Sequence, residues 1–158
     1  MNILGKDMKE YISAMKIPVV VNIAVSIIGV ILAVLAAVIT VASAPIGACI
    51  GVITGIGYLI ISVIIGIASA LYIGYLMAKK KSSTLIQAAV AGAIFGIIIG
   101  VVGGVLNIIG SVVNIALSVG TLGGNIIVAL IALIVGPIIS LIIGAICGAI
   151  GGAVGGAK

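Results

Sequence analysis

Long apolar stretches separated by short polar breaks dominate the chain. They cover about 17–43, 46–78, 84–118 and 124–156. Each is longer than the ~20 residues that a helix needs to cross the ~30 Å hydrocarbon core of a bilayer. None alternates between polar and apolar residues as the strands of a membrane barrel do. Because a backbone in lipid must satisfy its hydrogen bonds internally, the pattern predicts four transmembrane helices, despite many β-branched residues.

The breaks carry residues that begin or end helices. Pro45 disfavours helical geometry at the residue before it, so it marks the end of the first helix. Pro18 suits the first turn of that helix. Thr84, followed three residues later by Gln87, predicts a capping box at the start of the third helix. The pair Gly103–Gly104 predicts a bend within that helix.

Composition excludes a water-soluble fold. Hydrophobic residues make up 65% of the chain and charged residues 6%. Soluble domains carry about 25% charged residues. A disordered chain and a disulfide scaffold are excluded by the same numbers. We therefore expect an all-α, polytopic membrane protein.

The segment 1–16 has a different pattern from the rest. Its apolar and charged residues fall on opposite faces at helical spacing, which predicts a short amphipathic helix on the membrane surface. This helix would precede a four-helix transmembrane domain over 17–158. The apolar face consists of Ile3, Leu4, Met8, Tyr11, Ile12 and Met15.

All seven basic residues are lysines, and four spans would place them on one side of the membrane. The positive-inside rule then predicts a multi-pass protein of the cell membrane with both termini in the cytoplasm. Lysines at the surface attract anionic lipid by ~1 kcal/mol each. No base-stacking aromatic residues accompany them, so the lipid bilayer is the expected partner and nucleic acid is not. Apart from Lys158, they are Lys6, Lys9, Lys16, Lys79, Lys80 and Lys81.

Small residues recur at every fourth position in three of the expected helices. Residues four apart lie on nearly the same helix face, and a glycine stripe lets two backbones approach closely in lipid. This predicts helix packing through glycine zippers, either within the chain or between copies, and we expect a homo-oligomer or a membrane complex. The stripes include Gly47, Gly51, Gly55 and Gly66, then Gly92, Gly96, Gly100 and Gly104, and finally Gly136, Gly144, Gly148 and Gly152.

Polar residues also recur at helical spacing, on one face of the third helix beyond Gly104: Asn107, Ser111, Asn114 and Ser118. Intramembrane polar residues often mark a functional site. Neutral amides also commonly form hydrogen bonds between helices, which stabilise packing by ~0.6–2 kcal/mol. The face is therefore either the lining of an outer vestibule or packing material.

The groups that catalysis needs are missing. The chain has no His, and its two acids, Asp7 and Glu10, both lie in the N-terminal segment. No acid–base pair can then form within the spans. Cys49 and Cys147 are too few for a structural zinc site, which needs four ligands, and we expect two free, buried thiols. We expect no enzymatic activity, no cofactor and no metal.

Four spans with glycine stripes resemble the duplicated proteolipid subunits of rotary ATPases. That family needs a carboxylate in a spanning helix, which this chain lacks, so the resemblance covers the architecture alone. The pattern is also similar to small glycine-rich membrane proteins of unknown function, such as those of methanogenic archaea. The expected function is a non-enzymatic structural or accessory membrane protein. The alternatives are a pore or channel and a structural protein of a viral or vesicle envelope.

Overall fold

The computed structural model describes residues 2–117 and 124–158. A short antiparallel pair, β1 (Asn2–Ile3) and β2 (Lys6–Asp7), precedes four helices. The helices are α1 (Met8–Ala42), α2 (Ala44–Lys81), α3 (Leu85–Leu117) and α4 (Gly124–Val154). About 90% of the structure is helical, so the expected all-α class is confirmed.

All four helices are long and apolar enough to cross a membrane. The segments that meet this condition are Met8–Ala42, Cys49–Lys81, Leu85–Val112 and Leu130–Val154. Their outward faces carry exposed Ile, Val and Leu side chains, such as Ile53 and Ile134. A soluble helix turns such residues inward, whereas a helix in lipid can expose them. These features are those of a multi-pass membrane protein.

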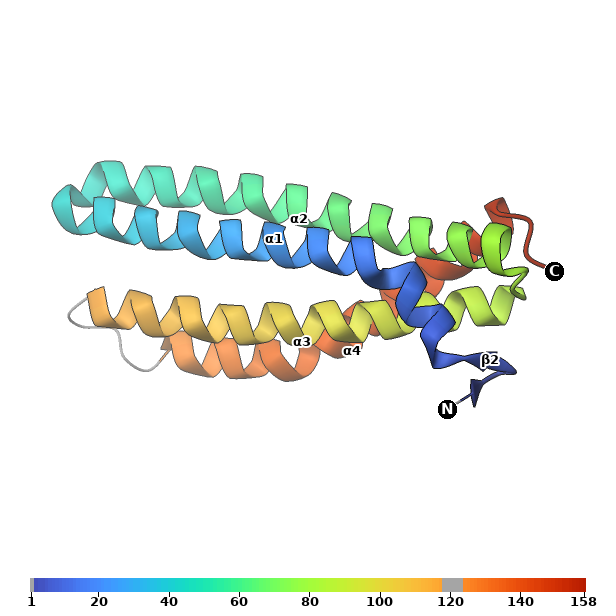
Figure 1. The fold of residues 1–158 in the computed structure, drawn as a ribbon. Coiled ribbons are helices and arrows are strands. Elements are labelled where there is room, and N and C mark those ends of the chain that lie inside the picture. Colours follow the sequence, from blue (N-terminus) through green and yellow to red (C-terminus); the bar gives the residue numbers. More distant parts are fainter. Residues whose placement is uncertain (1, 118–123) are drawn as a thin grey trace.

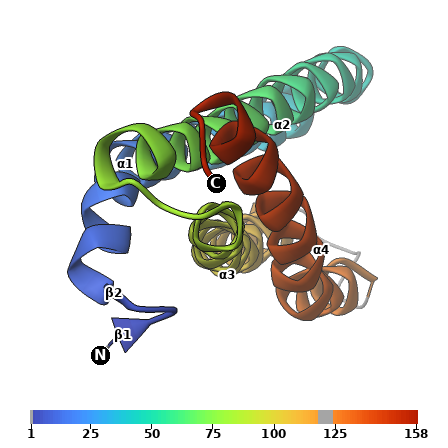
Figure 2. The same cartoon turned by 90° about the vertical axis from the view of Figure 1, so that its right-hand side faces the viewer.

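The helices form two hairpins, α1–α2 and α3–α4, that run side by side (Figure 1). Both chain ends and the connection between α2 and α3 lie at the same end of the molecule (Figures 1 and 2). The buried core lies towards this end. It is built around Tyr11 from α1, Ile73 and Met77 from α2, and Ala88 and Phe95 from α3. The hairpins are therefore joined most firmly at the end where the lysines gather.

The N-terminal segment differs from its prediction as a separate amphipathic helix. Residues 2–7 form the β1–β2 hairpin, whose turn places Leu4 and Gly5 at positive φ. The side chain of Asp7 then accepts a hydrogen bond from the backbone N–H of Lys9 (3.5 Å) and caps α1. The amphipathic residues from Met8 onward are the first turns of α1 itself, because an N-cap at Asp7 lets the helix start there.

Pro18 lies inside α1, so its expected place in a first turn is wrong. Proline lacks the N–H that would bond to the carbonyl four residues earlier, and its ring crowds that carbonyl. A helix commonly bends at such a position. The first turns of α1 run at an angle to the rest of the helix, across the end of the bundle (Figures 1 and 2).

The other predicted boundaries agree more closely with the structure. Pro45 occupies the first turn of α2, directly after the end of α1. The capping box is confirmed: the backbone N–H of Thr84 donates to Gln87 Oε1 (2.9 Å), and that of Gln87 donates to Thr84 Oγ1 (3.3 Å). At Gly103–Gly104, where a bend is expected, α3 continues through both residues without interruption. Gly104 instead packs against Leu133 of α4.

Candidate functional site

A cavity of about 570 Å³ lies between the two hairpins and is lined by residues of all four helices. On α1 its lining runs from Asn22 to Ala36, which is about 21 Å at 1.5 Å per residue. Small-molecule pockets in proteins measure roughly 300–1,000 Å³ and often lie between the helices of bundles. The cavity therefore has the size and the position of a binding site.

Glycines on the facing helices keep this space open. A Cβ atom added at Gly55 or Gly103 would meet no atom within 4 Å. At Gly51 the nearest atom would be Ala36 Cβ at 3.9 Å, and at Gly66 it would be Asn22 Oδ1 at 4.0 Å. The three α2 glycines that were expected to pack against a helix thus line the cavity instead. The surroundings of Gly47 lie outside the described residues.

The glycines of α3 and α4 have different surroundings. A Cβ at Gly92 would collide with the carbonyl group of Gly144, and one at Gly96 with that of Ser140. A Cβ at Gly148 would lie 2.6 Å from the carbonyl oxygen of Ala88. Contacts this short leave no room for a side chain, so the two backbones touch along this seam.

The remaining glycines of the predicted stripes differ in how closely they approach the facing helix. A Cβ at Gly100 would lie 2.5 Å from Pro137 Cα, and one at Gly152 would lie 2.5 Å from Ala88 Cβ. Gly136 has more room, since its nearest neighbour would be the Gly100 carbonyl oxygen at 3.9 Å. The tight part of the seam therefore runs from the lysine end to Gly100, and Leu133 covers the next position along it.

Asn22 forms the polar floor of the cavity at the lysine end. Its side chain is 5% exposed, and its Nδ2 atom donates to the Pro18 carbonyl oxygen (2.8 Å) and to Ser69 Oγ (2.8 Å). Both amide hydrogens are thereby used. The remaining Oδ1 atom lies towards Gly66, which also lines the cavity. None of the described residues donates a hydrogen bond to it.

Three hydroxyl groups of α1 and α2 continue the polar lining, and each donates to a carbonyl of its own helix. Ser26 Oγ donates to the Asn22 carbonyl (2.8 Å), Thr54 Oγ1 to that of Ile50 (2.7 Å) and Ser62 Oγ to that of Leu59 (2.9 Å). Because a hydroxyl has one hydrogen, these oxygens offer lone pairs to a molecule in the cavity for as long as the bonds within the helix are kept. None of the described lining residues carries a charge.

The polar face expected on the third helix contributes in part. Asn107 and Ser111 line the cavity in the half that is farther from the lysine end. The side chain of Asn114 and all of Ser118 lie outside the described residues. Sequence reasoning missed the α1 and α2 contributions, although Ser26, Tyr58 and Ser62 belong to small or polar rows at four-residue spacing. Tyr58 covers Gly29, so that a Cβ there would collide with its ring.

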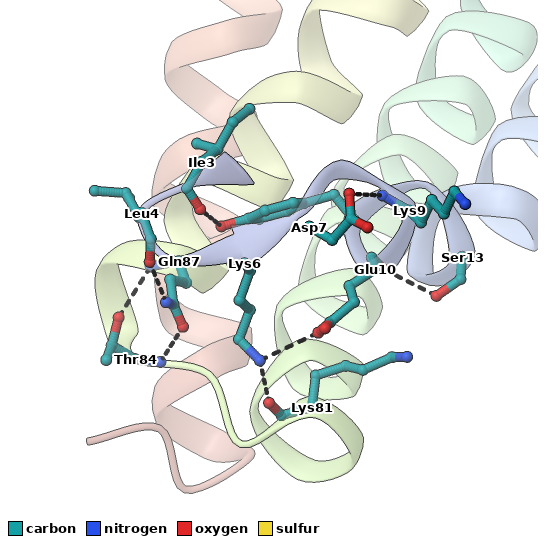
Figure 3. A network of polar contacts seen from close by, with 11 residues as sticks. Ile3, Leu4, Lys6, Asp7, Lys9, Glu10, Ser13, Lys81, Thr84 and Gln87 are labelled. Atoms are coloured by element: carbon teal, nitrogen blue, oxygen red, sulfur yellow. Dashed lines mark hydrogen bonds and ion pairs between the residues drawn. The ribbon is translucent and has the colours of Figure 1, made fainter. Parts of the chain in front are cut away.

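A second polar region ties the N-terminal hairpin to the start of α3 (Figure 3). Gln87 Nε2 donates to the Leu4 carbonyl (2.7 Å). Lys6 pairs with Glu10 (3.4 Å) and also donates to the Lys81 carbonyl. The C-terminal residue joins them, since the backbone N–H of Leu85 donates to the Lys158 carbonyl (3.1 Å).

The lysines expected at a membrane surface are therefore gathered at one end of the molecule. Lys6 and Lys81 are partly covered by the N-terminal hairpin and its neighbours. The others are exposed: Lys9, Lys16, Lys79 and Lys80.

Comparison of the chain with protein-family models, curated proteins and solved structures finds no match. Within the described ranges, no group of three His, Cys, Asp or Glu side chains could hold a metal ion. Both cysteines are free, but neither is fully buried as expected: Cys49 is exposed and Cys147 is half-buried. The geometry of the cavity and of the helix seams is therefore the basis for an assignment.

Proposed function

We propose that the chain is a non-enzymatic structural or accessory subunit of a membrane assembly, and that it associates through the outward face of the α1–α2 hairpin. The observation that carries this proposal is a hollow of about 320 Å³ on that face. Gly57 lies in it, and a Cβ there would meet nothing within 4 Å. Its other lining residues are Val25, Ile28, Leu32, Thr54, Tyr58 and Ile61.

A hollow of this kind suits a helix–helix contact in lipid. Apolar burial gives little driving force between helices there, so association depends on close packing at small residues. Gly57 lies about 200° around α2 from Gly55, so it faces away from the cavity. The tightest α3–α4 glycines are already occupied within the chain. This leaves the α1–α2 face for an apolar side chain of a neighbouring helix.

The size of the protein in a mild detergent tests the proposal. We expect a species larger than the monomer, and we expect Gly57→Leu to reduce it to a monomer with an unchanged melting temperature. Gly55→Leu is the matched control, because it adds the same side chain to the same helix on the opposite face. A parent protein that is monomeric in both vesicles and mild detergent would contradict the proposal.

A pore or channel for small solutes is the second candidate. The observation in its favour is that polar side chains from all four helices line one cavity, among them Asn22, Thr54, Asn107 and Ser140. Flux of small neutral solutes through vesicles containing the protein would support it. Flux equal to that of empty vesicles would rule it out.

A further inference from the structure

We propose that the cavity between the hairpins binds one neutral amphiphile, a hydrocarbon chain that ends in a hydroxyl group. The hydroxyl donates to Asn22 Oδ1, and the hydrocarbon extends away from it between the hairpins. Gly57 lines the hollow of the proposed assembly face and not this cavity, although Thr54 and Tyr58 line both. It goes beyond the proposed structural role and does not depend on it.

The acceptor at the floor of the cavity identifies the first group of the ligand. Asn22 is 5% exposed, and its two amide hydrogens are held by Pro18 and Ser69. Its Oδ1 atom faces the cavity beside Gly66, and no described residue donates to it. The oxygen is open to the cavity and is not sealed in by protein atoms. Away from bulk water, an amide oxygen that lacks a donor is unfavourable. A ligand that places a donor here relieves that cost.

Three hydroxyl groups of α1 and α2 in the lining favour the same chemistry. Ser26, Thr54 and Ser62 all spend their hydrogens on their own helices, so they too offer oxygen lone pairs. Beside Asn22 Oδ1 and these three hydroxyl oxygens, a ligand whose only polar groups are ester or ether oxygens would place acceptors against acceptors. An ionised head group would find no counter-charge among the described lining residues, and burying an unpaired charge is very unfavourable. An uncharged hydroxyl group fits both conditions.

The remaining lining is apolar and suits a hydrocarbon chain. Ile67, Phe95, Ile99 and Leu106 lie along the cavity from the lysine end towards the half that is farther from it. The lining on α1 extends about 21 Å, which gives the cavity an elongated shape. Asn22 lies near the lysine end, so the ligand would have its polar end near that membrane surface. This is the orientation in which an amphiphile lies in a bilayer.

Other occupants satisfy these features less completely. A partner helix uses its backbone donors internally, so it could reach Asn22 Oδ1 only with a polar side chain. Water could donate to Asn22, but it would leave Phe95 and the other apolar side chains hydrated. A hydroxylated hydrocarbon satisfies the oxygen and covers the apolar lining at once.

The test uses photolabelling of the full chain in phosphatidylcholine vesicles. The probe is hexadecanol with a diazirine at the far end of its chain, and the matched probe is its methyl ether, which cannot donate. We expect saturable labelling of cavity residues, at least threefold stronger with the alcohol than with the ether. Equal or unsaturable labelling by the two probes would overturn the proposal.

Two pairs of variants locate the effect. Asn22→Leu should remove the preference for the alcohol, while Ser69→Ala should keep it; both break the bond between α1 and α2, but only the first removes the acceptor. Gly55→Leu should reduce saturable labelling at least threefold, while Gly57→Leu should not. If Asn22→Leu fails to fold, the comparison of Gly55→Leu with Gly57→Leu still tests whether the probe binds in the cavity. Loss of labelling in Gly57→Leu, or none in Gly55→Leu, would overturn the site whatever the oligomeric state.

Discussion

Asn22 Nδ2 on α1 and Ser69 Oγ on α2 lie 2.8 Å apart, and their hydrogen bond joins the two helices at the floor of the cavity. Among the described residues it is the one bond between side chains that links two helices. Ser69 is buried at 9% exposure, so water does not replace Asn22 easily. The bond therefore fixes the rotation of α1 relative to α2 at this depth, while the second bond of Nδ2, to the Pro18 carbonyl of the same helix, holds the Asn22 amide in place.

Removing Ser69 Oγ should weaken the α1–α2 hairpin. We expect Ser69→Ala to lower the free energy of unfolding by about 0.6–2 kcal/mol, since interhelix hydrogen bonds in membranes are worth that much. The measurement is thermal or denaturant unfolding in one detergent. Ser62→Ala is the control, because Ser62 bonds only to Leu59 of its own helix. Equal melting of the two variants would show that the bond between the helices adds nothing.

The seam between α3 and α4 can be tested by overpacking. A side chain at Gly96 would collide with the carbonyl of Ser140, and one at Gly144 with that of Gly92. We expect Gly96→Ile and Gly144→Ile each to destabilise the protein by ~1–3 kcal/mol or more. Gly103→Ile should be close to neutral, because its Cβ meets nothing within 4 Å.

Unfolding of these three variants in the same detergent checks the prediction. Because Gly96 and Gly103 lie on the same helix, the comparison cancels the general effect of an isoleucine on α3. If Gly96→Ile and Gly103→Ile melt alike, the close approach of the two backbones does not contribute to stability.

Much of the fold follows from the sequence, because the spans and the residues that end them are local features. Pro45 and the Thr84–Gln87 pair locate helix starts without knowledge of the neighbours. The continuity of α1 was missed because Pro18 in a first turn and Pro18 inside a helix look alike in sequence. Asp7 could have indicated that α1 begins at Met8, because Asp is a favoured N-cap residue and stands just before the amphipathic turns.

The partners of the glycine stripes could not be predicted in the same way. Gly55 and Gly96 belong to equally regular rows, yet one lines open space and the other touches a carbonyl. The difference depends on how far the hairpins separate, which is a tertiary property. The cavity was missed for the same reason, since Asn22, Thr54 and Asn107 meet only when three helices are placed together.

The orientation in the membrane can be read with single cysteines. In a chain with Cys49 and Cys147 replaced by alanine, we expect Ser43→Cys to react with an impermeant maleimide on intact cells. Ser82→Cys should react only after the membrane is opened, because Ser82 follows the lysines at positions 79–81 and the positive-inside rule places them in the cytoplasm. Labelling in the reverse order would contradict the orientation.

Gln87 performs two tasks that one substitution can separate. Its Oε1 accepts from the Thr84 backbone and caps α3, while its Nε2 donates to the Leu4 carbonyl and holds the N-terminal hairpin. Glutamate keeps the accepting oxygen of a capping box but has no hydrogen to donate when ionised. Gln87→Glu should therefore preserve the start of α3 and release residues 2–7.

The release should be visible as faster cleavage by trypsin after Lys6 or Lys9 under native conditions. A hydrogen bond is worth about 0.5–1.5 kcal/mol, so we expect cleavage to accelerate roughly two- to twelvefold. Thr84→Val is the control, because it removes the hydroxyl of the cap and keeps the Gln87–Leu4 bond; it should destabilise α3 without that acceleration. If Thr84→Val is cleaved as fast as Gln87→Glu, the hairpin is held by the order of the α3 start and not by the bond from Gln87 to Leu4.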